Sequence, residues 1–240
     1  MKQKKQKGFF IVLEGTDGSG KTEQFKHLLK RFRKEGLAYQ TFDFPQYGQD
    51  SAYFVEEYLN GHYGSWQEVG PYRASIFYAL DRFQASQKIR FALKQGKIVL
   101  ANRYTASNLG HQGAKIKNKK ERIKFFKWLY DIEYRILGIP EPDLNIFLHV
   151  PAKIAYQLVG RKGKREYLKG KKRDIHEQDL LHLQAAEKAY LEAVEMFNNF
   201  VLIECAPAST RVERGEPKQK LLSIEEIAEK IWLTVKKLIF

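Results

Sequence analysis

Near its N-terminus the sequence reads Phe9-Phe10-Ile11-Val12-Leu13-Glu14-Gly15-Thr16-Asp17-Gly18-Ser19-Gly20-Lys21-Thr22. It begins with an unbroken apolar run, which is typical of a strand buried on both faces of a parallel sheet. Three glycines follow, and the residues from Lys21 to about Glu35 have helical character. Residues 15–22 have the form G-x-x-x-x-G-K-T, which is the pattern of a phosphate-binding loop, or P-loop.

The residue types in this loop suit a nucleoside triphosphate. Glycines let successive backbone N–H groups point at phosphate oxygens, and the N-terminus of the following helix adds partial positive charge. The ammonium of Lys21 can reach the β- and γ-phosphates, and the hydroxyl of Thr22 can ligate Mg²⁺. We therefore predict that residues 15–22 bind the triphosphate together with Mg²⁺.

Composition favours a single cytoplasmic domain. The chain has 240 residues, which fits one large α/β domain, and we expect a basic, solvated tail at 1–8 and the domain at 9–240. No apolar run has the length needed to span a bilayer, and the N-terminus lacks a signal-peptide pattern. The single cysteine, Cys205, excludes an internal disulfide and is expected to be a buried, inert thiol.

The net charge of +14 has two interpretations, nucleic-acid binding or the handling of polyphosphates. The basic residues are concentrated in the tail, at 115–124 and above all at 161–173, where eight of thirteen residues are Lys or Arg. No aromatic signature of an RNA-binding module and no zinc-ligand spacing is present. Small phosphorylated ligands are therefore favoured over nucleic acid.

Predicted strands alternate with predicted helices along the chain. The strands are expected at 9–13, 38–44, 97–101, 144–150 and 200–204, and the helices at 21–35, 51–59, 72–94, 121–137, 152–159, 177–198 and after Ser223. We expect irregular structure at 63–70, a flexible basic connection before 121, and a polar loop at 211–219. This order predicts a five-stranded parallel sheet with helices on both faces.

Ligands of such sheets bind at the carboxyl ends of the strands. The segments 15–22, 44–47, 102–108 and the residues after Val150 should therefore converge on one cleft. Arg103 follows the third strand, where its guanidinium fork suits a second phosphate, although a surface salt bridge is the alternative.

Tyr78 and Arg82 are four residues apart and share one helix face. A ring and a cation one turn apart can stack on a base and bond to its edge. On spacing alone, ordinary helix packing remains the alternative.

Several further motifs occur in a fixed order after the P-loop: Phe44-Pro45-Gln46-Tyr47-Gly48, Tyr78-Ala79-Leu80-Asp81-Arg82, Asn102-Arg103-Tyr104-Thr105-Ala106-Ser107-Asn108, Pro142-Asp143-Leu144 and Arg173-Asp174-Ile175-His176-Glu177. In this order and spacing the chain resembles the thymidylate kinase (dTMP kinase) family of P-loop nucleoside-monophosphate kinases. The resemblance implies a P-loop NTPase fold with a short basic lid, at about 161–174. It also implies Mg²⁺-dependent phosphoryl transfer from ATP to dTMP, and a homodimer.

The resemblance further implies roles for individual residues around the thymine. The residues concerned are Phe44, Pro45, Tyr78, Arg82, Ser107 and Asn108. Phe44 and Pro45 should pack beside the base, Tyr78 should stack on it, and Arg82 should bond to its O4 edge.

Toward the phosphates, the resemblance assigns Arg103 to the dTMP phosphate and Asp17 to the neighbourhood of the sugar hydroxyl and the metal. Gly18 stands where one branch of the family has an arginine in the P-loop, so the lid should supply the positive charge in this chain. The candidates are Arg161, Arg165 and Arg173, because a transferring phosphoryl group needs charge stabilisation on its equatorial oxygens.

The sequence departs from the family pattern at four places. Asn102 stands where the family usually has Asp, which affects metal handling or phosphate orientation. The loop at Phe44–Tyr47 lacks the arginine that is common in the family. Tyr47 is then the polar side chain of this loop that can reach toward phosphate. His111 replaces a tyrosine associated with excluding a ribose 2′-hydroxyl, and His176 replaces an aromatic residue near the end of the lid.

We predict a cytoplasmic, Mg²⁺-dependent dTMP kinase without a membrane partner. The alternatives are a related P-loop kinase with another pyrimidine nucleotide or a deoxynucleoside as acceptor, and a catalytically weak protein that binds nucleotides or nucleic acid.

Overall fold

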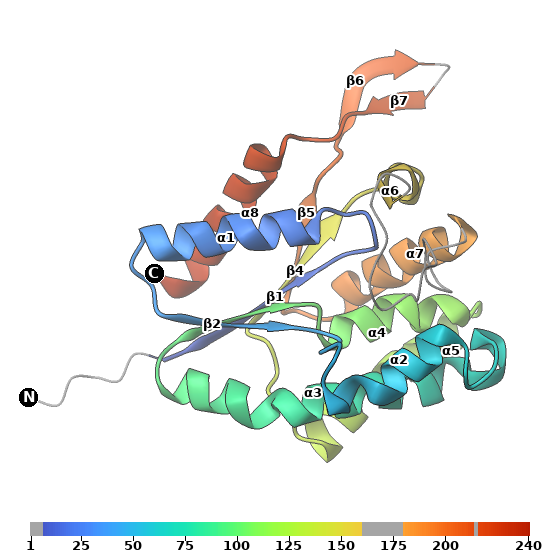
Figure 1. The fold of residues 1–240 in the computed structure, drawn as a ribbon. Helices are drawn as coiled ribbons and strands as arrows, with labels where there is room; N and C mark the ends of the chain where they lie inside the picture. Colours follow the sequence, from blue (N-terminus) through green and yellow to red (C-terminus); the bar gives the residue numbers. More distant parts are fainter. Residues whose placement is uncertain (1–6, 160–179, 214–215) are drawn as a thin grey trace, which may run out of the picture.

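The computed structural model describes residues 7–159, 180–213 and 216–240. Its centre is a parallel sheet of five strands in the order β2-β3-β1-β4-β5 (Figure 1). The strands are β1 (Phe9–Glu14), β2 (Tyr39–Asp43), β3 (Ile98–Asn102), β4 (Leu144–His149) and β5 (Phe200–Glu204). The predicted fold class is therefore confirmed.

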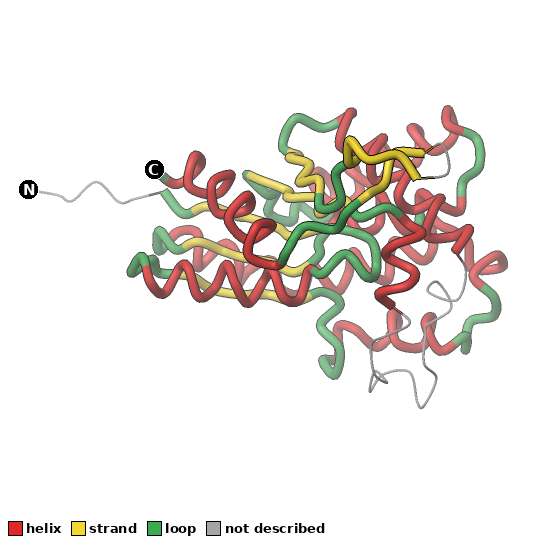
Figure 2. The backbone as a smooth tube through the Cα atoms, turned by 90° about the horizontal axis from the view of Figure 1, so that it is seen from above, coloured by secondary structure: helices red, strands yellow, loops and turns green. Residues whose placement is uncertain are grey.

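Each face of the sheet is covered by helices because alternate residues of the apolar strands point to opposite sides. Ile11 and Leu13 of β1 pack toward α1 (Lys21–Lys34) and α8 (Ile224–Ile239), where Trp232 belongs to the same core. Figure 2 looks at this side from above, with helices running along the yellow strands.

On the opposite face, Phe10 and Val12 pack with Ala85 and Ile89 of α3 (Trp66–Lys94). Fully burying each such side chain contributes roughly 1.5–3 kcal/mol.

The remaining helices surround the cleft end of the sheet. They are α2 (Tyr53–Asn60), α4 (Thr105–His111), α5 (Lys119–Tyr130), α6 (Ala152–Val159) and α7 (Leu180–Met196), with 3₁₀ turns at Asp50–Ala52 and Gly113–Lys115 and a π-helical turn at Asp131–Ile136. A third core cluster joins α4, α5 and α7 through Phe125, Phe126 and Tyr190. In the part of the chain that is described, no helix has the length and apolarity needed to cross a bilayer.

The expectation of irregular structure at 63–70 is wrong for its second half. Helix α3 begins at Trp66, where Ser65 and Glu68 form a reciprocal capping box. Gly70 then leaves the helical conformation with a φ of 72°, and Pro71 begins the long second part of the helix as predicted.

Two other expectations of loop are also wrong. Residues 105–111 form α4, a short helix that buries most of its residues and is held by tertiary packing, since seven residues do not make a stable helix alone. The polar segment 211–219 belongs to an antiparallel hairpin of β6 (Ala208–Glu213) and β7 (Glu216–Gln219), which projects from the body of the protein (Figure 1). Its sequence has few apolar residues, so the alternation that marks a half-buried strand is absent.

Candidate active site

The carboxyl ends of the strands open into one cavity of about 510 Å³. Its walls are residues 17–23, 43–45, 47, 59, 78, 81, 82, 102–104, 107, 108, 111 and 112. The predicted convergence of the P-loop, the 44–47 loop and the 102–108 segment is confirmed. Residues 151–159, the described part of the segment after Val150, do not line the cavity, although Ala155 of α6 lies against the P-loop.

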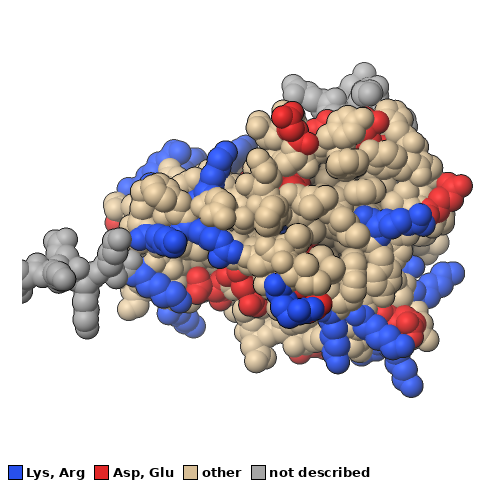
Figure 3. All heavy atoms as spheres, turned by 90° about the horizontal axis from the view of Figure 1, so that it is seen from below, with Lys and Arg blue, Asp and Glu red and all other residues tan. Residues whose placement is uncertain are grey.

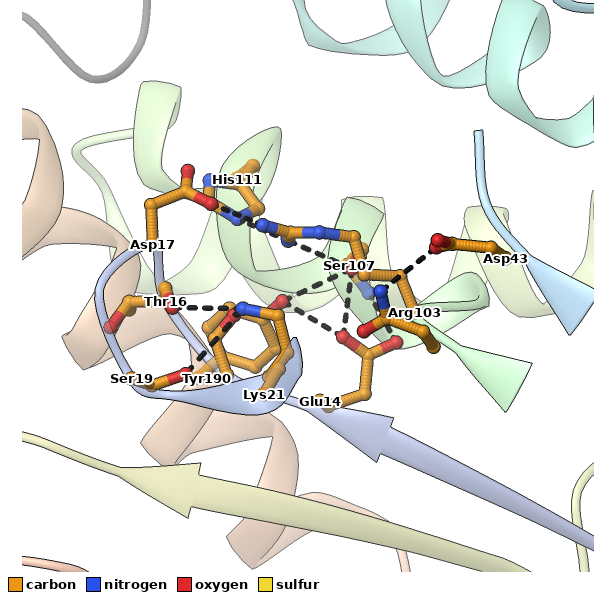
Figure 4. A network of polar contacts seen from close by, with 12 residues as sticks. Glu14, Thr16, Asp17, Ser19, Lys21, Asp43, Arg103, Ser107, His111 and Tyr190 are labelled. Atoms are coloured by element: carbon orange, nitrogen blue, oxygen red, sulfur yellow. Dashed lines mark hydrogen bonds and ion pairs between the residues drawn. The ribbon is translucent and has the colours of Figure 1, made fainter. Parts of the chain in front are cut away.

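The P-loop wraps around the ammonium of Lys21. Its Nζ donates to the carbonyl oxygens of Gly15 at 2.8 Å and Thr16 at 2.9 Å, and lies 3.5 Å from Oγ of Ser19 (Figure 4). Gly15 and Thr16 therefore shape the loop from behind, whereas residues 17–22 face the cavity. The ammonium of Lys21 and the N-terminus of α1 therefore lie close together. Both carry positive charge that can attract the phosphates of a nucleotide.

Gly18 has no room for a side chain. Its φ is +86°, and an added Cβ would lie 2.3 Å from the carbonyl oxygen of Ala155. An arginine at this position is therefore excluded by the packing of α6. The basic segment that we expect to supply charge instead, with Arg161, Arg165 and Arg173, lies outside the described residues, as does His176.

Arg103 faces the P-loop from the end of β3. Its backbone has a φ of +66° and its N–H donates to the carbonyl of Leu13 at 2.9 Å. Its guanidinium reaches Asp17 through Nη2, and Nη1 lies 3.3 Å from Oγ of Ser107 and 3.0 Å from Nε2 of His111. Although burial works against the charged form, Asp17 raises the pKa of Arg103, so the cation is firmly held.

His111 is a neutral acceptor in this cluster. Burial holds the pKa of its imidazole well below the ordinary value. At neutral pH its Nε2 therefore accepts a hydrogen bond from Arg103, which places the ring proton on Nδ1. The ring also stacks at 6.1 Å on the ring of His182 in α7.

The predicted base pocket is formed by side chains from the 44–47 loop, α3 and α4. Phe44, Pro45, Tyr47, Tyr78 and Asn108 all line the cavity. The rings of Tyr78 and Tyr58 are nearly perpendicular, with their centroids 6.4 Å apart, and Nδ2 of Asn108 donates to the carbonyl of Ser75 at 3.2 Å. These contacts fix both side chains from behind.

The 44–47 loop is tied to α3 by a buried carboxylate. Oδ2 of Asp81 accepts the backbone N–H of Gln46 at 2.9 Å, and Oδ1 accepts from the Gln46 side chain at 3.0 Å and from the Ser51 hydroxyl at 2.6 Å. Gln46 thus turns toward the protein, and Tyr47 is left as the exposed polar side chain of the loop.

The side chain of Arg82 is more deeply buried than its predicted contact with the base led us to expect. It lines the cavity but is only 2% exposed. Its Nε and Nη2 donate to Glu133 at 2.7 and 2.6 Å, and Glu133 also accepts from Thr105 at 2.8 Å. The Nη1 group remains beside the carbonyl of Tyr104, at 3.4 Å.

Asn102 is paired with a carboxylate that the sequence did not single out. The strand ends are in register, and Nδ2 of Asn102 donates to Oδ1 of Asp43 at 2.8 Å. The amide oxygen of Asn102 is buried and has no hydrogen-bond partner within the described part of the chain. An acidic group therefore stands one strand away from the position where Asn replaces Asp.

Sequence reasoning missed several polar residues of this site, chiefly Glu14, Asp43, Asp81 and Glu133. For Glu14 a signal existed, because a charged residue directly follows an apolar strand at its carboxyl end. Asp43 has the same position one strand away. Glu133 gave no such signal, since it lies 51 residues from its partner Arg82 on another helix.

Known proteins resemble the chain over most of its length. The family model described as thymidylate kinase matches residues 13–215. A thymidylate kinase of Mycobacterium tuberculosis is 32% identical over 183 residues, covering 76% of this chain and 84% of the relative. A probable thymidylate kinase of Pyrococcus abyssi is 28% identical over 96% of this chain and 97% of the relative.

The fold is also that of a solved structure. A thymidylate kinase from Candida albicans superimposes with a TM-score of 0.70 at 19% identity, covering 96% of this chain and 92% of that one.

Proposed function

Because the chain belongs to the thymidylate kinase family, we propose that it transfers the γ-phosphoryl group of ATP to dTMP, giving ADP and dTDP. The observation that carries this proposal is a single cavity with two cationic sites. Lys21 marks the P-loop on one side, and Arg103 stands across from it in contact with Asp17.

Phosphoryl transfer needs positioning and electrostatic stabilisation more than covalent chemistry. In this scheme Lys21 and the N-terminus of α1 bind the phosphates of ATP, and Arg103 holds the acceptor phosphate with a planar fork. Phe44 and Tyr78 enclose the base. The Nη1 group of Arg82, which Glu133 does not occupy, is the donor proposed for O4 of thymine.

The residues present fit a Mg²⁺ ion. The Thr22 hydroxyl, the Asp43 carboxylate and the amide oxygen of Asn102, which has no hydrogen-bond partner among the described residues, are candidate oxygen ligands. Mg²⁺ takes one or two carboxylates together with phosphates and waters. Held there, a Mg²⁺ ion would supply positive charge that offsets the charge of the phosphates. Asp43 would supply the carboxylate that position 102 lacks.

The basic segment 161–173 is proposed to complete the charge around the transferring group, with Arg161, Arg165 and Arg173 as its candidates. The exclusion of any side chain at Gly18 supports this, because the P-loop cannot carry an arginine there.

The family also suggests a homodimer, and the surface of α3 supports one. Ile76, Leu80 and Phe83 fall on one face of the helix and are 40%, 42% and 46% exposed. On the underside of the molecule, the side on which α3 lies in Figure 1, Figure 3 shows uncharged surface bordered by groups of charged side chains. We propose that this face pairs two copies of the single domain 9–240 in the cytoplasm, which sedimentation equilibrium can check.

Steady-state ADP production with Mg-ATP tests the proposed function. The acceptors are dTMP, dUMP, UMP and thymidine, and Lys21→Met is the control for a contaminating kinase. We expect selective turnover of dTMP that the variant loses. Equal turnover of UMP would show that His111 does not exclude a 2′-hydroxyl, and absence of turnover with every acceptor would refute the kinase assignment.

A further inference from the structure

Glu14 ends β1 directly before the P-loop and is completely buried. Oε1 accepts the backbone N–H groups of Tyr104 at 2.7 Å and Ser107 at 3.1 Å, and Oε2 accepts the hydroxyls of Ser107 at 2.7 Å and Tyr190 at 3.1 Å. An ionised carboxylate only accepts hydrogen bonds, so it matches this set of donors. Burial raises the pKa of Glu14, and the charge of Arg103 opposes that shift.

The Ser107 hydroxyl connects Glu14 to Arg103. Because it gives its hydrogen to Glu14, its oxygen can accept from Nη1 of Arg103, 3.3 Å away. The hydrogen bonds therefore run in one direction, from Arg103 through Ser107 to Glu14 (Figure 4). Asp17 and His111 hold the same guanidinium from its other sides.

The backbone of this turn depends on Glu14 as well. Arg103 has a φ of +66°, a conformation that costs a non-glycine residue roughly 1–3 kcal/mol unless its surroundings enforce it. The next N–H, that of Tyr104, donates to Glu14. The carboxylate thus fixes Arg103 through the main chain and through the side chain.

Tyr190 forms a rigid wall behind the carboxylate. Its ring stacks on Phe147 at 4.7 Å and lies so close to Gly110 that an added Cβ would be 2.1 Å from it. The phenol hydroxyl donates to Oε2 of Glu14 at 3.1 Å and also lies 3.3 Å from Oγ of Ser107. It therefore flanks the chain of bonds to Arg103 without joining Ser107 to the guanidinium, so Tyr190→Phe removes one flanking donor and leaves the Ser107 hydroxyl in place.

We propose that Glu14 is a positioning residue for phosphoryl transfer, whose buried carboxylate orients the Ser107 hydroxyl so that the hydroxyl oxygen fixes the guanidinium of Arg103 across from the P-loop. The inference rests on the proposed function, in which Arg103 holds the acceptor phosphate. It ties the acceptor side of the cavity to the last residue of β1, directly before the ATP-binding loop.

Glu14→Gln tests this with almost no change in shape. The amide oxygen must face the N–H groups of Tyr104 and Ser107, so the NH₂ group turns toward the two hydroxyls. Among the described residues, the only nearby acceptors are then the hydroxyl oxygens of Ser107 and Tyr190. The new amide hydrogens compete for these oxygens with the two hydroxyl hydrogens and with the N–H of Arg103. Arg103 reaches the open cavity and is the group that is displaced.

The measurements are kcat and KM for dTMP and for ATP in Glu14→Gln, Ser107→Ala, the double variant and Tyr190→Phe. We expect Glu14→Gln and Ser107→Ala each to lower kcat/KM for dTMP by about 10- to 100-fold, as for a misplaced catalytic group, with KM for ATP unchanged. The double variant should lose no more than either single one, because both act on the same chain of bonds. Ser107→Thr, which keeps the hydroxyl, should recover most of the activity that Ser107→Ala loses. Tyr190→Phe should cost less than Glu14→Gln, because it removes one donor beside the chain and leaves the contact between Ser107 and Arg103.

Additive losses in the double variant, or an equal rise in KM for ATP, would overturn the inference in favour of a purely structural Glu14. If wild type makes no dTDP, the proposed function fails while the inference remains testable. Crystal structures of wild type and Glu14→Gln then decide, since we expect Arg103 Nη1 to leave Ser107 in the variant. An unmoved guanidinium would refute the positioning role.

Discussion

Arg82 and Arg103 look alike in the sequence but have opposite surroundings in the structure. Both were predicted to contact the nucleotide, and both line the cavity. The side chain of Arg82 is 2% exposed and is held in a bidentate pair by Glu133, which is completely buried. That of Arg103 is 19% exposed; its Nη2 contacts Asp17, and its Nη1 contacts both Ser107 and His111.

The difference shows that position relative to the sheet decides how a buried arginine is used. Arg82 lies in the middle of a long helix, where the nearest partner is a side chain of the packed helix layer. Arg103 follows a strand at its carboxyl end, where the chain opens toward ligands. This contrast supports the proposal that Arg82 serves mainly the stability of the pocket and that Arg103 serves its chemistry.

The largest effect is expected from breaking the Arg82 pair. Glu133→Ala leaves a buried guanidinium without its counter-charge, which should lower the free energy of unfolding by about 3–5 kcal/mol. Urea unfolding followed by circular dichroism measures this. Asp17→Asn, which weakens the pair of the more accessible Arg103, should cost only about 1 kcal/mol.

A second variant separates charge from packing. Replacing both partners, with Arg82→Met and Glu133→Leu, should recover most of the lost stability, because an apolar pair of similar volume needs no desolvation. Equal losses for Glu133→Ala and Asp17→Asn would contradict the contrast between the two arginines.

The next effect concerns activity rather than stability. Arg103→Lys replaces a planar fork by a single ammonium, which cannot contact Asp17, Ser107 and a phosphate at once. We expect kcat/KM for dTMP to fall by about 10²- to 10³-fold, the usual cost of a lost transition-state donor, with stability changed by less than about 1 kcal/mol. Steady-state kinetics and urea unfolding of the same preparation check both parts.

The reverse pattern is expected for Arg82→Lys, whose ammonium cannot make the bidentate pair with Glu133. Stability should fall more in this variant than in Arg103→Lys. If Arg103→Lys keeps wild-type activity, Arg103 does not hold the acceptor phosphate.

Much of this comparison was visible in the sequence, and its limits have physical causes. The apolar run at 9–13 and the glycines of the P-loop specify local structure directly. The rule that ligands bind at strand ends then placed Arg103 in the cleft. Glu133 was not predictable as the partner of Arg82, because a tertiary contact between distant helices leaves no periodic mark.

The same cause explains the missed elements and the missed carboxylates. Helix α4 has weak intrinsic propensity and exists because its residues are buried by α7 and α5. Glu14 stands directly before the P-loop in the sequence, yet its four donors come from segments about 90 and 176 residues away. Only the folded chain brings them together.

The smallest expected effect is on the pH dependence of stability. It contrasts two histidines, His111 and His149, whose surroundings differ as those of the two arginines do. Burial beside the cation Arg103 lowers the pKa of His111. Against the cost of burial, the hydrogen bonds that the ring nitrogens of His149 make to the carboxylates of Glu187 and Glu204 raise its pKa. His111 therefore lowers stability as the pH falls below the unfolded value of about 6.5, because the unfolded chain binds its proton more readily.

The contribution of His149 to stability changes with pH in the opposite direction. Its contribution is fully present below about pH 6.5 and is lost as the pH rises through its raised folded pKa. Urea unfolding of wild type, His111→Gln and His149→Gln between pH 5.5 and 8.5 measures both, with differences on the order of 1 kcal/mol or less after solvent screening. The free energy of unfolding of wild type minus that of His149→Gln should decrease as the pH rises. The same difference for His111→Gln should increase as the pH rises. Parallel pH profiles for the two variants would mean that their charged neighbours do not set their protonation.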